Sequence, residues 1–546
     1  MYNIPTIIIT SYINIDDDDD DYYDEEDEYY EEDEDNYQYN KTKDKKSSKP
    51  QPPSKPQVQS KSHPANPKPT QPQSTSSEPS KKKPKDNKDL SPSELNAIKY
   101  PPISYKQISN SSSSSDRTDI SIVVIGHVDS GKSTLMGHLL YDLGCIDKKV
   151  LQSCKKNYKK TGTSQFHYAW ATDEGTDERE RGVTVEVAYK SFTTKTKNVN
   201  AMDAPGHRDF IPSMIAGTSA ADAAILVIDS GQNAFDHGFF KGGQTKEHAI
   251  LAKTLGVKQI IVCINKLELF NWNKERFDYI KIQVHSFLTS IGFKDEDIFC
   301  IPISGLTGDN ILHPITASTG SWYEDKTLID LIDNLEAPIR VNDAPVRFVI
   351  SDASFGTVND YQGYTVFGKL ECGVIDTKTE YEIQPTGLKV KIRSIAVNKE
   401  KVNYVLTGQT AELLLNLDKN SNEEISSGFV LSSVEYGVPV VKAFQAQVKT
   451  LDIKCPVSVG QKMFLHLQGQ KVQVKVRKIV KIYNDDNSTV KNNSIFIPKN
   501  FNANVIVDCE EKICAELYGN IKQLGRIALR GEGETIAIGF ITEFVA

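Results

Sequence analysis

The sequence predicts an α/β domain with a parallel sheet covered by helices on both faces, then two antiparallel β-barrel domains, all behind a disordered N-terminal tail. Three textures along the 546 residues support this division. The first is charged and low in complexity, the second alternates strand-length apolar runs with helix-like stretches, and the third is rich in short β segments. We place the four parts at 1–118, 119–340, 341–437 and 438–546.

The tail is acidic and then basic, although the whole chain has a formal net charge of −9. Residues 16–35 hold sixteen acidic residues and no basic one, whereas residues 41–90 hold thirteen Lys against four acidic residues. Blocks of like charge repel one another and cannot bury a core, so we expect residues 1–118 to be disordered.

One stretch of the tail, "LSPSELNAI", has a helix start signal. Ser91 and Glu94 have the spacing of a capping box, and Pro92 fits the first helical position. A short docked helix fits these residues, but the sequence favours a transient turn.

Cysteine usage and hydropathy indicate a reducing compartment. The eight Cys show no CxxC pair, and no apolar run reaches the ~18 residues that a membrane span needs. The opening "MYNIPTIIITSYINI" lacks the basic start and the cleavage site of a signal peptide. We therefore expect a cytoplasmic, monomeric protein with no membrane partner.

The α/β part begins with "ISIVVIGHV", and further apolar runs of strand length are "VNAMD", "AAILVID", "QIIVCIN" and "IFCIPIS". Helix-like stretches alternate with them at 132–143, 207–218, 244–255 and 273–291. Strands that are apolar throughout are buried on both faces, which favours a parallel sheet between helices.

The β-rich part includes "GYTVFGKLECGVI", "LKVKIRSIAV" and "QKVQVKVRKIVKIY", separated by Gly, Asn and Asp. About 200 residues of this texture fit two barrels or sandwiches. The break lies near "SSVEYGVP", where a strand ends in Gly437 and Pro439.

The stretch "GHVDSGKST" has the phosphate-loop pattern G-x-x-x-x-G-K-[ST] between a predicted strand and a predicted helix. Gly126 and Gly131 allow a tight turn, so backbone N–H groups of residues 129–134 (Asp129, Ser130, Gly131, Lys132, Ser133 and Thr134) face an anion. Lys132 reaches the β- and γ-phosphates, and the Ser133 hydroxyl can bind Mg²⁺.

The next apolar run ends in "MDAPGH". Asp203 can hold Mg²⁺ through a water, and Gly206 can offer its N–H to the γ-phosphate. His207 is placed to orient an attacking water, with a hydrogen bond that only caps the following helix as the alternative. The D-x-x-G pattern is weak alone and becomes strong at a strand end after a phosphate loop.

Two further strands end in "INKLE" and "ISGL", which places Asn265, Lys266 and Glu268 beside Ser304, Gly305 and Leu306 at the carboxyl edge of the sheet. A carboxylate there can accept guanine N1–H and N2–H₂ together, whereas adenine lacks that donor pair. Glu268 is one bond longer than Asp, roughly 1.5 Å. We expect GTP to be preferred still, with a degenerate, poorly binding loop as the alternative.

Together these motifs resemble those of translational GTPases of the elongation-factor-1-alpha superfamily, and the resemblance spans about four-fifths of the chain. Four further stretches contribute to it: "ERERGVTVEV", "GGQTKEHA", "SGLTGDN" and "LGRIALRGEGETIAIG". Three branches compete. The long charged extension, "FDHGFFKGGQTKEHA" and "NWNKERF" argue against the aminoacyl-tRNA carrier. "FHYAWATDEGTDERERGVTVEV" and "DFIPSMI" favour the Hbs-type ribosome-rescue branch, and "GEGETIAIG" leans toward the eukaryotic class-II release factor.

The resemblance implies GTP and Mg²⁺, with Thr184 as the second Mg²⁺ hydroxyl ligand and His207 as the catalytic residue beside Lys132. It also implies ribosome-stimulated hydrolysis at the sarcin-ricin region of the rRNA. We favour the Hbs-type branch, whose partner would be Pelota, a release-factor-like protein delivered to stalled ribosomes in rescue and mRNA surveillance. The release-factor branch would carry the class-I release factor instead. A carrier scaffold with weak GTPase activity is a further alternative.

Overall fold

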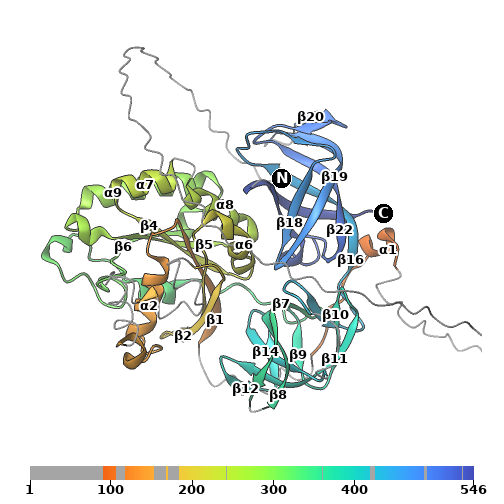
Figure 1. The fold of residues 1–546 in the computed structure, drawn as a ribbon, viewed down its shortest axis with the longest axis horizontal. Coiled ribbons are helices and arrows are strands. Elements are labelled where there is room, and N and C mark those ends of the chain that lie inside the picture. The colour runs from red at the N-terminus through yellow and green to blue at the C-terminus, as the bar shows by residue number, and fades with distance from the viewer. Residues whose placement is uncertain are drawn as a thin grey trace, which may run out of the picture. The chain divides into compact units, whose positions relative to one another are not determined.

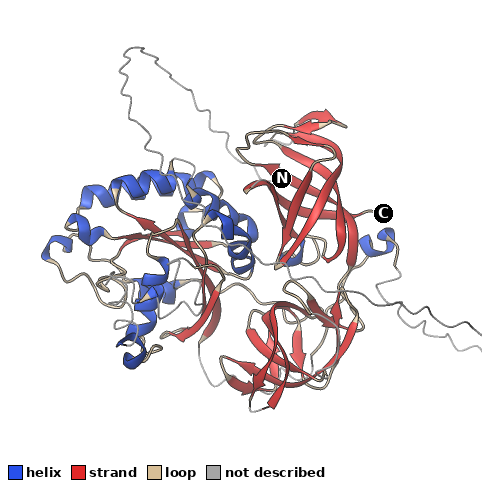
Figure 2. Cartoon of the chain, in the orientation of Figure 1, coloured by secondary structure: helices blue, strands red, loops and turns tan. Residues whose placement is uncertain are grey.

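The computed structural model describes residues 90–105, 117–152, 168–169, 184–240, 243–359, 361–417, 425–484, 488–531 and 533–546. Within these residues an α/β domain is followed by two bodies built of antiparallel strands (Figures 1 and 2). The predicted fold class is confirmed.

The α/β domain is built on a six-stranded sheet in the order β2-β3-β1-β4-β5-β6. All neighbours in it are parallel except the edge strand β2, which pairs antiparallel with β3. The strands are β1 (Thr118–Gly126), β2 (Ala188–Thr193), β3 (Lys197–Asp203), β4 (Ala223–Asp229), β5 (Gln259–Asn265) and β6 (Ile298–Pro302).

Helices cover both faces of this sheet (Figure 2). They are α2 (Lys132–Asp142), α6 (Ile211–Ser219), α7 (Gln232–Phe239), α8 (Gln244–Leu255), α9 (Lys274–Ser290) and α10 (Leu328–Asn334). Short 3-10 turns are η3 (Arg208–Phe210), η4 (Leu267–Phe270), η5 (Asp295–Asp297) and η6 (Ser318–Gly320). The sequence did not predict β2, α7 or α10.

Strand β1 shows why the sheet is buried on both sides. Val123 and Ile125 belong to an apolar cluster that includes α6, α8 and α9, while Ile122 and Val124 belong to a cluster with α2 and α10. Successive side chains of a strand point to opposite faces, so an unbroken apolar run requires a helix layer on each face.

The second body is a closed antiparallel barrel in the order β10-β15-β7-β8-β14-β11-β12, with β10 also paired to β11. Its strands are β7 (Arg347–Val358), β8 (Tyr361–Cys372), β9 (Val374–Asp376), β10 (Glu380–Gln384), β11 (Leu388–Val397), β12 (Glu400–Val402), β13 (Tyr404–Leu406), β14 (Thr410–Leu415) and β15 (Val430–Ser433). Closure removes the free strand edges of an open sheet.

The third body is closed in the same way, in the order β18-β23-β24-β16-β22-β19-β20 with β18 also paired to β19. Its elements are β16 (Val440–Thr450), β17 (Val457–Ser458), β18 (Lys462–Leu467), β19 (Gln470–Tyr483), β20 (Thr489–Asn492), β21 (Phe496–Ile497), β22 (Asn502–Cys514), η7 (Gln523–Gly525), β23 (Arg526–Gly531) and β24 (Glu534–Phe544).

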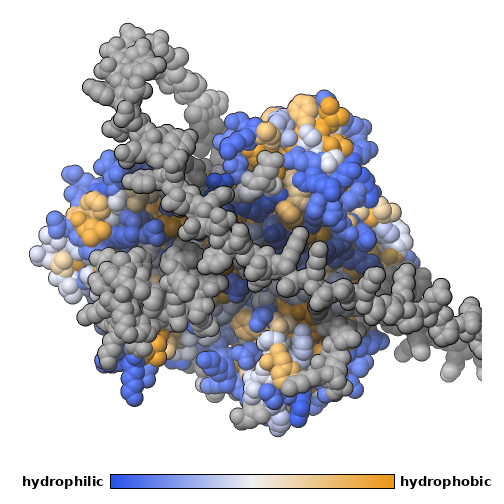
Figure 3. Space-filling model, in the orientation of Figure 1, coloured by the Kyte–Doolittle hydropathy of each residue, from blue (hydrophilic) through white to orange (hydrophobic). Residues whose placement is uncertain are grey.

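Apolar side chains gather at the outer end of this third body, near β20 (Figure 3). The large exposed ones in β20, β21 and the adjoining turns are Val459, Val490, Ile495 and Phe496. The Lys491 ammonium lies 5.9 Å from the centre of the Phe496 ring.

The segment 90–105 corrects one expectation, because it is ordered rather than part of a disordered tail. Helix α1 (Pro92–Asn96) has the full capping box, with Ser91 and Glu94 bonded reciprocally. Leu95 is buried in the core of the third body. The favoured transient turn is therefore wrong, and the helix is docked because Leu95 and its neighbours find partners far along the chain.

Beyond α1 the segment contacts both barrels, and we call residues 90–105 the strap. The Asn96 side chain exchanges two hydrogen bonds with the Phe544 backbone. The Tyr100 hydroxyl donates to Glu516 and accepts from Arg347, each at 2.9 Å. The Tyr105 hydroxyl donates to the Ala344 carbonyl at 2.9 Å. The strap thus ties the second body to the third.

Helices long and apolar enough to cross a lipid bilayer do not occur among the described residues.

Candidate active site

The phosphate loop joins the end of β1 to the start of α2. Gly126 has φ 148° and Gly131 has φ 91°, which L side chains rarely adopt. A Cβ on Gly126 would lie 2.2 Å from the Val227 carbonyl oxygen, and one on Gly131 would lie 2.4 Å from Asn265 Nδ2. Both glycines are therefore required by the turn. The first N–H groups of α2 have no partner within the helix, so they form an anion site.

Lys132 lies inside this loop. Its side chain is buried, and its ammonium donates to the His127 carbonyl at 2.7 Å. Burial lowers the pKa of Lys132 to about 8, although Asp203 and Asp129 act in the opposite direction. A Cβ on Gly206 would lie 2.3 Å from Lys132 Nζ. The glycine of "DAPGH" therefore leaves room for the Lys132 ammonium, the charge predicted to face the phosphates.

The two hydroxyl groups expected to bind Mg²⁺ lie together. Ser133 Oγ on the first turn of α2 is 3.0 Å from Thr184 Oγ1, and Thr184 is buried. Asp203 ends β3, is buried, and is close enough to influence the pKa of Lys132. Two hydroxyls and a carboxylate beside a phosphate loop are a suitable oxygen set for Mg²⁺, which retains several waters in such sites. The donor chemistry fits.

His207 is placed differently from the simplest expectation. It is the N-cap of η3, and its Nδ1 accepts the Asp209 N–H at 3.3 Å. The imidazole is 43% exposed and lies 5.7 Å from the Phe210 ring. In this conformation His207 caps the helix start, and Nε2 is the nitrogen left to bind a water.

The predicted base-reading loops hold the phosphate loop from the other side. Asn265 donates to the Ser130 carbonyl at 2.8 Å, and its Oδ1 accepts the Gly305 N–H at 2.8 Å. Lys266 donates to the Asp129 carbonyl at 2.6 Å and pairs with Asp229 at 2.7 Å. These bonds bring the three loops together at one edge of the sheet.

Glu268 lies at the same edge, on η4. Its Oε2 is buried and has no hydrogen-bond partner among the described residues. Burial raises the pKa of Glu268, while a hydrogen bond with Ser304 and the charge of Lys266 lower it. A buried carboxylate oxygen without a donor is what a guanine N–H pair would satisfy. The loop with the long acid therefore fits guanine chemically. Leu306 of the second predicted base-reading loop is half-buried.

Sequence reasoning missed His248 of α8. Its Nδ1 accepts the Gly126 N–H at 3.3 Å, and it is fully buried behind the phosphate loop. Burial, with Lys132 and His127 nearby, lowers the pKa of His248 to about 3, so it is neutral at neutral pH. The stretch "GGQTKEHA" contains this residue, and its helical spacing from the buried Thr245 and Ala252 was an available signal.

Comparison with known proteins agrees with this geometry. Residues 118–338 match the elongation factor Tu GTP binding domain, and residues 443–542 match the family described as GTP-eEF1A C-terminal domain-like. Elongation factor 1-alpha of Coccidioides immitis (strain RS) is 35% identical over 444 residues, covering 78% of this chain and 94% of that protein. The chain belongs to the elongation-factor-1-alpha superfamily. Members of this superfamily are translational GTPases, and this chain is a GTP-hydrolysing member of it.

Within the superfamily, Protein HBS1 of Drosophila melanogaster is 38% identical over 441 residues, which cover 80% of this chain. The same alignment spans 65% of the Drosophila protein. The solved structure of the S. cerevisiae Ski7 GTPase-like domain bound to GTP has a TM-score of 0.65 at 19% identity, covering 78% of this chain and 97% of that one. It shows that the fold is shared.

Proposed function

We propose that this GTPase delivers a release-factor-like protein, Pelota, to stalled ribosomes in the cytoplasm and is released by hydrolysing GTP. One observation supports the GTPase mechanism in this proposal. The phosphate loop, the Ser133–Thr184 hydroxyl pair and the loop that holds Asn265 lie together at one edge of the sheet. The similarity to Protein HBS1 supports the rescue branch. Delivery of a class-I release factor in termination is the second candidate.

In the proposed mechanism the protein binds GTP mainly by positioned charge. Backbone N–H groups of the loop and the Lys132 ammonium face the β- and γ-phosphates, where they stabilise charge that develops as the γ-phosphoryl group leaves. Ser133, Thr184 and, through water, Asp203 would hold Mg²⁺, which supplies charge neutralisation between the phosphates when bound.

Hydrolysis requires His207 to change partners. Bonded to the Asp209 N–H, it caps η3 and positions no substrate. Losing this single 3.3 Å bond would free the exposed ring to turn toward the γ-phosphate and orient a water for attack on phosphorus. The bond from the γ-phosphorus to the bridging oxygen breaks, and GDP carries that oxygen away. We propose that ribosome contact supplies this reorientation, so the free protein is slow.

The GTPase part is tested by guanine-nucleotide affinity and by turnover with ribosomes and partner present. We expect Lys132→Ala to abolish binding and His207→Ala to leave binding intact while lowering stimulated turnover by on the order of 10²-fold or more. His285→Ala on α9, another partly exposed histidine beside an aspartate, is the matched control and should be unaffected. If the wild-type protein hydrolysed GTP no faster than the Lys132→Ala variant, the GTPase mechanism would be wrong. The protein would then be a carrier that nucleotide binding alone controls.

The partner is tested by capture. Tagged full-length protein loaded with a non-hydrolysable GTP analogue or GDP is mixed separately with Pelota, class-I release factor and aminoacyl-tRNA. We expect GTP-dependent capture of Pelota. Capture of the class-I release factor instead would move the protein to the termination branch, and capture of aminoacyl-tRNA would contradict both.

A further inference from the structure

A buried imidazole lies against the loop of residues 304–310, which contains the second predicted base-reading stretch. His138 of α2 is 7% exposed, and its Nδ1 lies 2.9 Å from the Gly305 carbonyl oxygen. A carbonyl oxygen only accepts hydrogen bonds, so Nδ1 carries the hydrogen and donates it. None of the steps proposed for GTP hydrolysis uses this side chain.

The loop closes tightly around the imidazole. Gly308 has φ 85°, and a Cβ there would lie 2.7 Å from His138 Cε1. The Gly305 N–H donates to Asn265 Oδ1 at 2.8 Å. Gly305 is therefore held through its N–H by the first base-reading loop and through its carbonyl by His138.

The position of Gly305 matters for the acid that is predicted to read guanine. Gly305 follows Ser304, whose side chain is hydrogen-bonded to Glu268. Glu268 Oε2 is buried and has no hydrogen-bond partner among the described residues. The direction of this carboxylate thus depends on Ser304, and the place of Ser304 depends on the two bonds that hold Gly305.

An aromatic ring stacks on the imidazole and limits its motion. The ring centres of Tyr168 and His138 are 4.2 Å apart, and the two planes are inclined by 11°. Tyr168 is buried, and a Cβ on Gly137 would lie 2.2 Å from the Tyr168 carbonyl oxygen. His138 Nε2 lies 3.7 Å from Asp142 Oδ2, four residues further along α2. The imidazole therefore has little freedom to turn away from Gly305.

We propose that His138 is a positioning residue for guanine recognition, which holds the second base-reading loop where Glu268 can accept both guanine donors. Without the His138 N–H, the Gly305 carbonyl would lose its buried partner, and the loop would relax. Glu268 would then lose its alignment with N1–H and N2–H₂ together, because a bidentate pair needs a fixed geometry. The inference deepens the proposed function, since it rests on GTP binding at this site and not on the identity of the delivered partner.

Base discrimination tests this role in the full-length protein. Inosine triphosphate has the N1–H of GTP but lacks the N2 amino group, so it reports on the second donor. The affinities of GTP and inosine triphosphate are measured with Mg²⁺ by displacement of a fluorescent GDP. His138→Leu keeps the bulk and removes the donor. We expect it to weaken GTP binding and to reduce the preference for GTP about tenfold.

Two other variants separate the donor from the ring. His138→Asn places an amide N–H near the position of Nδ1, so it should restore the preference for GTP to within about twofold of wild type. Tyr168→Leu leaves the donor and removes the stacked ring, so it should reduce the preference about threefold. If His138→Leu failed to fold, Tyr168→Leu would carry the test, and an unchanged preference would overturn the inference.

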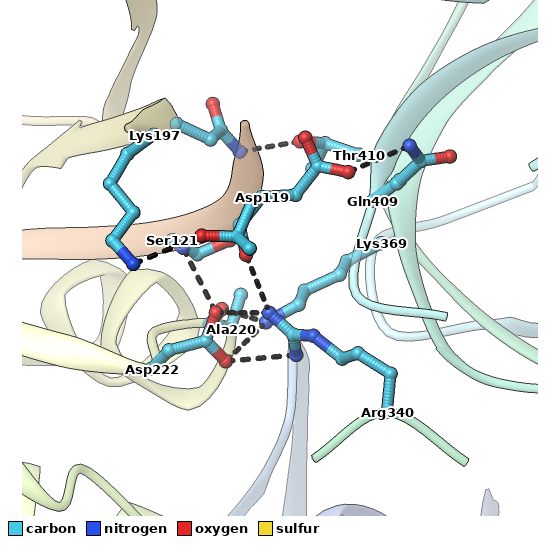
Figure 4. Close-up of polar contacts among 11 residues, drawn as sticks. Asp119, Ser121, Lys197, Ala220, Asp222, Arg340, Lys369, Gln409 and Thr410 are labelled. Atoms are coloured by element: carbon cyan, nitrogen blue, oxygen red, sulfur yellow. Dashed lines mark hydrogen bonds and ion pairs between the residues drawn. The ribbon is translucent and has the colours of Figure 1, made fainter. Parts of the chain in front are cut away.

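A second cluster of polar contacts supplies the matched control (Figure 4). Asp222 pairs with Arg340 at 2.6 Å, and Gln409 donates to Asp119 at 2.8 Å. These contacts join the second body to the start of β1, whereas the phosphate loop begins at the end of that strand, at Gly126. Gln409→Ala also removes a partly buried hydrogen bond, so it should lower the melting temperature without changing the preference for GTP.

Two results would overturn the inference. One is that His138→Leu weakens the binding of GTP and inosine triphosphate equally, as a general loss of stability would. The other is that His138→Asn discriminates as poorly as His138→Leu, because the donor would then not hold the loop. A wild-type protein without a preference for GTP would contradict the reading of guanine by Glu268, and this inference with it.

Discussion

Tyr100 gives a sharp prediction about the strap. Its hydroxyl bridges the fully buried ion pair of Arg347 and Glu516, in which Arg347 Nη2 and Glu516 Oε1 are 2.7 Å apart. Burial raises the pKa of Tyr100, so the hydroxyl stays protonated and remains a donor. Tyr100→Phe keeps the ring over the guanidinium, whose carbon lies 5.2 Å from the ring centre, and removes only the oxygen.

The expected cost follows from the two bonds that are lost. Hydrogen bonds to charged groups contribute about 1.5–3 kcal/mol each, but the ion pair keeps its other bonds. We therefore expect Tyr100→Phe to lower the free energy of strap opening by about 3 kcal/mol. Tyr105→Phe removes one bond to a neutral carbonyl and should cost about 1 kcal/mol.

Hydrogen exchange of the full-length protein measures this opening directly. The Ile103 N–H, bonded to the Asp343 carbonyl at 2.7 Å, reports on it. Since about 1.4 kcal/mol is a factor of ten, Tyr100→Phe should speed its exchange on the order of 100-fold and Tyr105→Phe about fivefold. If the Tyr105 variant exchanges as fast as the Tyr100 variant, the buried bridge does not hold the strap.

Three further predictions concern the site. Glu268→Asp should tighten GTP binding about tenfold if the longer acid forces a misfit, and unchanged or weaker affinity by nucleotide titration would count against this. Asn265→Ala removes the bonds to Ser130 and Gly305, so the nucleotide-free α/β domain should lose about 2–3 kcal/mol in chemical denaturation; a wild-type transition would contradict the bridging role. His248 has a folded pKa of about 3 against about 6.5 unfolded, so its contribution is present above pH 6.5 and is lost as pH falls toward 3. By pH 4.5 this removes about 3 kcal/mol; His248→Gln should flatten the pH dependence of unfolding, and parallel pH curves would refute the assignment.

Much of the α/β fold could be predicted because its signals are local. The apolar runs of β1, β4 and β5 can only be buried strands, and the glycines of the phosphate loop carry their own backbone requirement. The elements that were missed have weaker signals. The edge strand β2 has only one buried side chain, Phe192, and α7 and α10 are only eight and seven residues long.

The candidate site divides in the same way. Motif spacing predicted that Lys132, Ser133 and Asn265 would share one sheet edge, and the structure brings them together. For His207 the sequence left two roles open, a water-orienting residue and a helix cap, and the structure shows the cap, since the surrounding conformation decides which partner the side chain takes. His248 was missed because its partner, the Gly126 N–H, lies 122 positions earlier in the chain.

The sequence by itself determined the phosphate loop, because such a loop is built from neighbouring residues whose glycines and helix start act over one turn. Only the tertiary structure decided what the strap does. Tyr100 meets Glu516 across 416 positions. Burial makes such distant polar contacts strong or costly, and no local pattern records it.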